Sequence, residues 1–122
     1  MAELMKAAIL TEFEKIEMAQ VPVPQIGEGD VLVRVKNCGI CGSDVGYYFG
    51  SMLTGKMPII LGHEFTGEVV EVGAIPRSMG LFKPGDRVVV NPVQHCNACY
   101  NCASGKTNLC SNLYVPGVNA DG

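Results

Sequence analysis

The chain has 122 residues, of which 48% are apolar and 17% are charged, and its formal net charge is −3. A chain of this length forms at most one domain with a modest core. Its apolar runs are far shorter than the roughly 20 residues that cross a membrane, and its scattered Lys and Arg form no basic stripe for nucleic acid. The N-terminal segment contains Glu3 and no extended apolar stretch, which argues against a secretory signal and favours a cytoplasmic location.

Short strands separated by glycine and proline are the elements that the sequence predicts. In chain order, the expected strands are Met5–Leu10, Ile16–Val21, Asp30–Lys36, Phe65–Val72 and Asp86–Val90. The first two form a hairpin, and Ser43–Phe49 predicts a short helix with Ser43 or Asp44 as its N-cap. Many short strands with turns between them favour an antiparallel barrel or sandwich. There is no βαβ alternation and no G-x-G-x-x-G motif, so a nucleotide-binding fold is not expected here.

Four cysteines near the C-terminal end stand in the order C-x2-C-x2-C-x7-C, and they are Cys96, Cys99, Cys102 and Cys110. This spacing lets four thiolates converge on one zinc ion, and four protein ligands leave no position for water, so the site is expected to be structural. An iron–sulfur cluster would favour a closer fourth cysteine followed by proline, whereas Ser111 follows Cys110. Paired disulfides are the other alternative, and a reducing compartment disfavours them.

A second cluster combines Cys41 with the run Gly62-His63-Glu64. Cysteine and histidine ligands with one open position are the arrangement of a catalytic zinc. Neighbours in a regular strand point to opposite faces, so His63 and Glu64 would converge only if the backbone at Gly62 lets both turn inward. Cys38 and Cys41 also form a C-x-x-C pair, which could be a redox pair or simply two buried thiols. The residues alone leave these alternatives open.

Three motifs in the same order carry a family resemblance. Gly62-His63-Glu64-x2-Gly67-x5-Gly73 resembles the signature of the zinc-dependent medium-chain alcohol dehydrogenases, and it lies between the segment 38–44 and the turn 83–88 that precedes the cysteines. The pattern is most similar to the sorbitol, threonine and other polyol dehydrogenases. The resemblance implies a GroES-like catalytic domain over residues 1–122, a mainly β, partly open barrel with short helices and a structural zinc lobe over 94–113. It also implies that this chain is truncated before the Rossmann domain.

The resemblance implies roles for individual residues of the second cluster. Cys41 and His63 would hold a catalytic zinc, and Glu64 would be a ligand or a close carboxylate. Asp44 would accept the other ring N–H of His63 and so fix its tautomer. Ser43 would bond the substrate alcohol and pass its proton towards solvent.

Other positions are assigned by the same resemblance. Tyr47 would line the substrate pocket, and Cys38 matches a position that is not a ligand. Gly46 stands where many members carry a histidine that completes a proton relay. Residues 74–80 extend the end of the signature and include Pro76, so a surface loop is expected there.

The function implied by the resemblance is oxidation of a small alcohol or polyol by a zinc-dependent dehydrogenase. NAD or NADP would bind to a further domain of the longer protein, so this chain alone is expected to be inactive. The family commonly forms dimers or tetramers, which allows a homo-oligomer. Two alternatives stand beside this reading: a non-catalytic zinc-binding module or truncated scaffold, and a thiol–disulfide oxidoreductase that uses Cys38 and Cys41.

Overall fold

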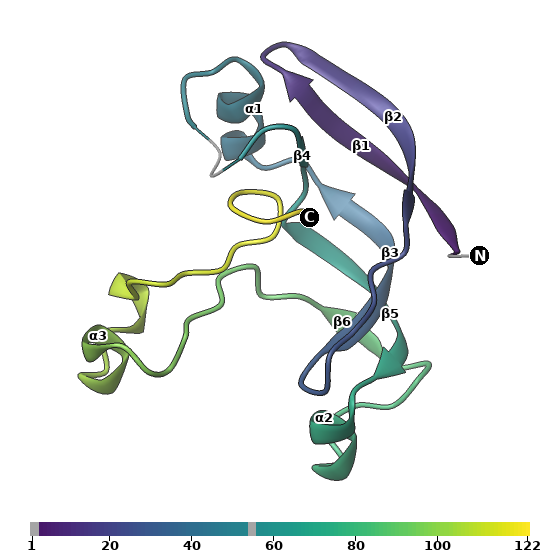
Figure 1. Ribbon diagram of the computed structural model, residues 1–122, viewed down its shortest axis with the longest axis vertical. Coiled ribbons are helices and arrows are strands. Elements are labelled where there is room, and N and C mark those ends of the chain that lie inside the picture. The colour runs from purple at the N-terminus through teal and green to yellow at the C-terminus, as the bar shows by residue number, and fades with distance from the viewer. Residues whose placement is uncertain (1–2, 54–55) are drawn as a thin grey trace.

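Two three-stranded sheets form the body of the computed structural model, which describes residues 3–53 and 56–122 (Figure 1). The first sheet has the order β2–β1–β4 and consists of β1 (Leu4–Glu12), β2 (Lys15–Pro22) and β4 (Ile59–Ile60). The second has the order β3–β5–β6 and consists of β3 (Val31–Gly39), β5 (Glu64–Val72) and β6 (Arg87–Val89). Neighbouring strands in both sheets pair antiparallel. The predicted mainly β fold is therefore confirmed.

The helices are short and lie between or beyond the strands (Figure 1). They are α1 (Gly42–Tyr48), α2 (Ala74–Ser78), α3 (Tyr100–Ala103) and the 3-10 helix η1 (Thr107–Leu109). The segment that carries α3 projects away from the two sheets (Figure 1). Within the described ranges, no helix is both long enough and apolar enough to cross a membrane.

A small core joins α1 to the first sheet. Leu10 and Ile59 pair across β1 and β4 and are 0% and 1% exposed. Tyr47 of α1 packs with them, and Val118 from near the C-terminus lies against the same cluster. Because burial of large apolar side chains is the main favourable term in folding, this cluster fixes α1 on the sheet. The N-terminal end of α1, where Cys41 lies, is held in place as a result.

Two local predictions need correction. The predicted helix is present, but its N-cap is Cys41, not Ser43 or Asp44. Asp44 is the third helical residue, and its carboxylate reaches back to accept the backbone N–H of Cys41 at 2.8 Å, as in a capping box.

The segment expected to be a surface loop, residues 74–80, begins instead with helix α2. Pro76 is buried at the third position of this helix, where the missing N–H of proline has no intrahelical acceptor in any case. Proline therefore does not prevent a helix from starting here.

The pairing of β3 with β5 positions the second cluster. Gly39, the last residue of β3, lies opposite Glu64, the first residue of β5. The segments just beyond these strand ends contain Cys41 and His63, so the antiparallel register brings them to the same end of the sheet. This register is what makes residues far apart in sequence neighbours in space.

Candidate metal centres

Cys41, His63 and Glu64 converge at the end of the second sheet. One possible ligand atom from each, a thiol sulfur, a ring nitrogen and a carboxylate oxygen, lies within 4.8 Å of the other two. His63 is buried at 7% exposure, Cys41 is partly buried and Glu64 is exposed. The group therefore opens to solvent on the Glu64 side and is closed behind His63.

His63 and Glu64 turn to the same point because they do not share a strand. β5 begins at Glu64, so His63 precedes it and the strand alternation does not apply to the pair. Gly62 has a φ of +114°, a conformation that side chains other than hydrogen rarely allow. A Cβ atom on Gly62 would also lie 2.9 Å from Cys38 Sγ. Glycine at this position lets the chain turn so that both side chains face Cys41.

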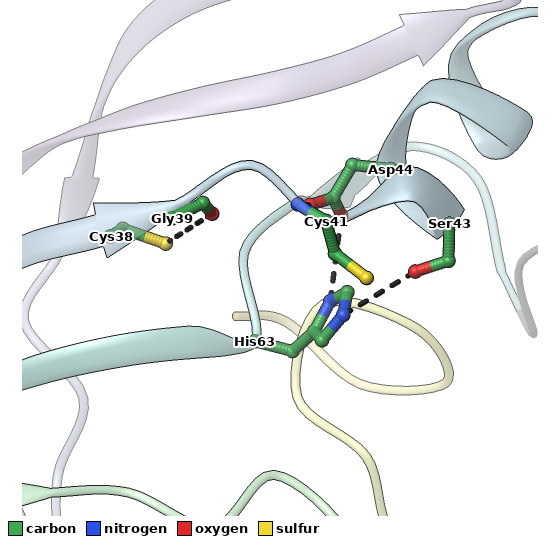
Figure 2. A network of polar contacts seen from close by, with 6 residues as sticks. All are labelled: Cys38, Gly39, Cys41, Ser43, Asp44 and His63. Carbon is green, nitrogen blue, oxygen red and sulfur yellow. Dashed lines mark hydrogen bonds and ion pairs between the residues drawn. The ribbon is translucent and has the colours of Figure 1, made fainter.

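Asp44 contacts both His63 and the backbone of Cys41 (Figure 2). Its Oδ1 lies 3.4 Å from His63 Nδ1, and its Oδ2 accepts the Cys41 N–H at 2.8 Å. The side chains of His63 and Asp44 are only 9% and 10% exposed, so this pair is largely screened from water. One carboxylate thus orients the ring of one candidate ligand and the main chain of the other.

The contacts of the His63 ring define its chemistry. A carboxylate only accepts, so Asp44 favours the tautomer with hydrogen on Nδ1 and leaves the lone pair on Nε2. Nε2 lies 3.3 Å from Ser43 Oγ, and the side chains of Cys41 and Ser43 both point towards the ring (Figure 2). At 3.4 Å the Nδ1–Oδ1 contact is long, and both atoms otherwise lack hydrogen-bond partners among the described residues. A cation on Nε2 would strengthen this pairing by polarising the Nδ1–H group.

The remaining predicted residues lie around this group but outside it. Tyr47 is 5% exposed and belongs to the core cluster, so its contact with a substrate stays a prediction. Cys38 Sγ is not among the converging atoms and donates to Gly39 O at 3.5 Å. Burial, with the nearby Asp44 charge, raises the pKa of the Cys38 thiol. Met52 covers Gly46, where a Cβ atom would lie 2.9 Å from the Met52 sulfur.

The four cysteines of the projecting lobe also converge. Cys96, Cys99, Cys102 and Cys110 have sulfurs that all lie within 4.8 Å of one another. A tetrahedron with zinc–sulfur bonds of about 2.3 Å has edges of about 3.8 Å, which is compatible with sulfurs that all lie within 4.8 Å of one another. Backbone N–H groups point at the sulfurs: Cys96 N–H to Cys110 Sγ at 3.3 Å, Cys99 N–H to Cys96 Sγ at 3.4 Å and Asn112 N–H to Cys110 Sγ at 3.3 Å.

These contacts favour thiolates unequally. Backbone N–H groups, first that of Ser111, lower the pKa of Cys99 to about 6, and backbone N–H groups of Ala98 and Cys99 lower that of Cys96. Burial raises the pKa of Cys102 to about 12, and shared hydrogen bonds with neighbouring thiols add to this. Converging thiols cannot all lose their protons without a cation between them. The donor set therefore fits a zinc ion with four thiolates.

The lobe has little apolar packing of its own. Tyr100 and Leu109 are 83% and 56% exposed. Gln94 and Tyr114 close the base of the lobe through two backbone hydrogen bonds of 3.0 and 2.9 Å. The lobe therefore depends on its hydrogen bonds and on the interactions among its four cysteine sulfurs.

Similarity to known proteins assigns the chain to a family. The family model of the alcohol dehydrogenase GroES-like domain matches residues 27–122. The chain belongs to this family. The resemblance predicted from the three motifs is therefore confirmed.

Within this GroES-like domain, the sequence motifs gave no sign of the two backbone hydrogen bonds between Gln94 and Tyr114 that close the base of the lobe. The bond from Cys41 N–H to Asp44 could have been predicted, because a carboxylate three residues after an N-cap is the capping-box spacing.

Relatives of this GroES-like domain are longer proteins. An uncharacterized zinc-type alcohol dehydrogenase-like protein of Haemophilus influenzae Rd is 44% identical over 122 residues, which is 100% of this chain and 35% of that protein. Sorbitol dehydrogenase of Bacillus subtilis 168 is 42% identical over 113 residues, 89% of this chain and 31% of that protein. A structure described as the short chain alcohol dehydrogenase RspB of Escherichia coli CFT073, solved with NADH, has a TM-score of 0.86 at 39% identity. The match covers 98% of this chain and 34% of that chain. The chain thus spans about a third of the length of these relatives.

Proposed function

We propose that residues 1–122 are the N-terminal catalytic domain of a zinc-dependent alcohol or polyol dehydrogenase that uses NAD or NADP. One zinc would be bound by Cys41 and His63, with Glu64 as a ligand or close carboxylate. A second, structural zinc would be bound by the lobe over residues 94–113. The convergence of Cys41, His63 and Glu64 in front of the buried Asp44 is the observation that carries this proposal. NAD or NADP would bind to a part of the longer protein outside this chain.

The residues of the candidate catalytic site fit a zinc ion. Cysteine, histidine and a carboxylate are the ligands that catalytic zinc sites combine, with one position left for substrate. Such a zinc polarises the alcohol oxygen and lowers its pKa. Asp44 holds His63 in the ligating tautomer, and its bond to Cys41 N–H fixes the chain that presents the thiolate. Glu64 lies on the exposed side, where a substrate would arrive.

Ser43 would receive the alcohol proton. Its Oγ lies 3.3 Å from His63 Nε2, so a hydroxyl at this point would contact an oxygen bound beside the histidine. Ser43 is partly buried and can pass a proton towards water. The relay does not continue through residue 46, because Gly46 has no side chain and Met52 covers it.

The alternatives from the sequence are less well supported. A thiol–disulfide oxidoreductase needs a reactive cysteine of low pKa, whereas partial desolvation and the nearby Asp44 charge raise the pKa of Cys38, although this residue is exposed. A scaffold without catalysis would need Asp44 only to cap α1, which leaves the contact of this buried carboxylate with His63 without a purpose. The sorbitol dehydrogenase relative favours a polyol among the small alcohols.

The test uses the full-length protein, changed at one of the two histidines of this 122-residue chain. His63→Asn should reduce kcat/KM for a polyol panel with NAD or NADP by on the order of a hundredfold or more, and bound zinc should fall by one ion per chain. His95→Asn is the matched control, because His95 is exposed and belongs to neither of the two groups of converging ligand atoms. A His63→Asn variant with wild-type zinc content and wild-type turnover would contradict the proposal.

A further inference from the structure

We infer that the turn formed by residues 115–122, here called the backing turn, positions His63. The turn lies directly against Gly62, the residue before His63. In Figure 1 this segment loops between the two sheets, far in sequence from β5. The inference rests on the proposed function, since it concerns how His63 is held ready to bind zinc.

The contact is between main chains and leaves no room for a side chain. Gly117 is buried, and a Cβ atom on it would lie 2.5 Å from Gly62 O and 2.7 Å from Gly62 N. A Cβ atom on Gly122 would also collide with Gly62 O. Two glycines of the backing turn therefore enclose the peptide group that leads into His63. Neither neighbour is a flexible side-chain end, so any added atom must displace the backbone.

Side-chain hydrogen bonds shape the backing turn from within. Asn119 Oδ1 accepts the Val115 N–H at 2.8 Å, and Asn119 Nδ2 donates to Leu113 O at 2.7 Å. Gly117 N–H donates to Ala120 O at 2.8 Å. These bonds set the position of Gly117 without any contribution from Gly62.

Further contacts attach the backing turn to the first sheet. Val118 packs on the core cluster that contains Leu10 and Ile59. Gly122 N–H donates to Ile60 O at 2.9 Å, and Asp121 Oδ1 accepts the Ile60 N–H at 3.1 Å. The turn is therefore fixed to the same sheet that carries α1, and α1 carries Cys41 at its start.

This attachment explains why the position of Gly62 matters for the site. Cys41 is located by α1, whereas His63 is located by the chain that enters β5 through Gly62. The chain runs from β4 of the first sheet through Leu61 to Gly62, and the backing turn packs against this link and holds it in place. Metal sites need their ligands held to within about 0.5 Å, so displacement of Gly62 would separate His63 from Asp44 and Cys41.

Gly117→Ala tests the inference, with Gly80→Ala as its matched control. Gly117 and Gly80 have φ values of +74° and +66°, so alanine strains the backbone alike at both. Nothing lies within 4 Å of a Cβ atom on Gly80. The measurements are zinc per chain, zinc affinity by competition with a chromophoric chelator, and kcat and KM of the full-length protein.

We expect the wild type and Gly80→Ala to bind two zinc ions per chain. Gly117→Ala should keep the lobe zinc but bind the second ion at least about tenfold more weakly, with a matching loss of kcat. A wild type that binds only the lobe zinc would show that the proposed function is wrong. A wild type with two ions and a Gly117→Ala variant equal to Gly80→Ala would overturn the positioning inference alone.

Asn119→Ala keeps the inference testable if Gly117→Ala does not fold. This change removes the two hydrogen bonds of the Asn119 side chain and adds no atom near Gly62. It should weaken the second zinc ion while the lobe zinc is retained, and Asn119→Asp, which keeps the acceptor for Val115 N–H, should recover part of the loss. Undiminished zinc affinity in Asn119→Ala would contradict the inference.

Discussion

Replacing Asp44 by asparagine separates the two contacts of its carboxylate. The asparagine oxygen can still accept the Cys41 N–H that Asp44 accepts at 2.8 Å. Its amide nitrogen then faces His63 Nδ1, which lies 3.4 Å from Asp44 Oδ1. If His63 keeps the tautomer that leaves Nε2 free for zinc, its Nδ1–H and the amide N–H of the asparagine are two donors that face each other. The substitution therefore disturbs the candidate metal site more than it disturbs the helix.

The magnitudes follow from these contacts. Exchanging a charged for a neutral acceptor at Cys41 N–H should lower the free energy of unfolding of the metal-free protein by about 1 kcal/mol. At His63, a buried ring N–H without an acceptor and a less basic ligand should weaken zinc about 10–100-fold. This factor corresponds to about 1.4–2.7 kcal/mol of binding free energy. The loss of zinc affinity should thus exceed the loss of stability.

The assay compares Asp44→Asn with Asp86→Asn. Asp86 Oδ2 accepts the Lys83 N–H at 2.9 Å across the same sequence separation, but it lies on an exposed turn with no histidine. Urea unfolding after metal removal gives the stability, and chelator competition gives the zinc affinity. We expect similar stabilities for the two variants and weakened zinc only in Asp44→Asn. Wild-type affinity for both zinc ions in Asp44→Asn would refute the reasoning.

Two further predictions concern other parts of the chain. Cys99→Ser should release the lobe zinc. Because the lobe has little apolar packing, its backbone amides between Gln94 and Tyr114 should then exchange fast, while those of the sheets stay protected. Amides that stay protected from exchange throughout the lobe would contradict this prediction. For Asp121, burial acts to raise the pKa, but hydrogen bonds from Lys56 and Ile60 outweigh it, so the pKa is lowered from 3.8. A lowered folded pKa adds stability above the unfolded value that is lost as pH falls through the folded one. Below about pH 4, the free energy of unfolding of the wild type should therefore fall with pH by up to about 1 kcal/mol more than that of Asp121→Asn. The same pH dependence of unfolding in both proteins would count against the pairing.

Local patterns predicted the strands well because their causes are local. The 5–21 hairpin and the strands that begin near residues 31, 64 and 87 follow from alternation and from glycine and proline at their ends. β4 was not predicted, since two residues carry no pattern and Ile59 becomes a strand residue only by pairing with Leu10. α2 was missed because Pro76 suggests a break unless its position within the first turn is known.

The candidate sites differ in how far sequence could reach. Closely spaced cysteines nearly determine their own convergence, so the lobe could be predicted from spacing. The meeting of Cys41 with His63 depends on the β3–β5 register, a non-local fact that only the family resemblance indicated. The contact of the backing turn with Gly62 depends on packing between distant main chains. Glycine spacing gives no signal for such a contact, because the partner of each glycine cannot be read from the chain.

The 122-residue chain alone is expected not to oxidise alcohols, even with zinc bound at Cys41 and His63. Hydride transfer requires the nicotinamide to lie against the substrate carbon, and such orientation contributes about 7–11 kcal/mol to catalysis. The described residues contain antiparallel sheets and no βαβ unit that could hold a dinucleotide. Two hollows among the described residues, of about 430 and 470 Å³, are lined by residues other than Cys41 and His63. Circular dichroism and zinc content would first establish that the isolated chain is folded. Zinc-dependent reduction of NAD or NADP by that folded, contaminant-free chain would then show that the orientation argument is wrong.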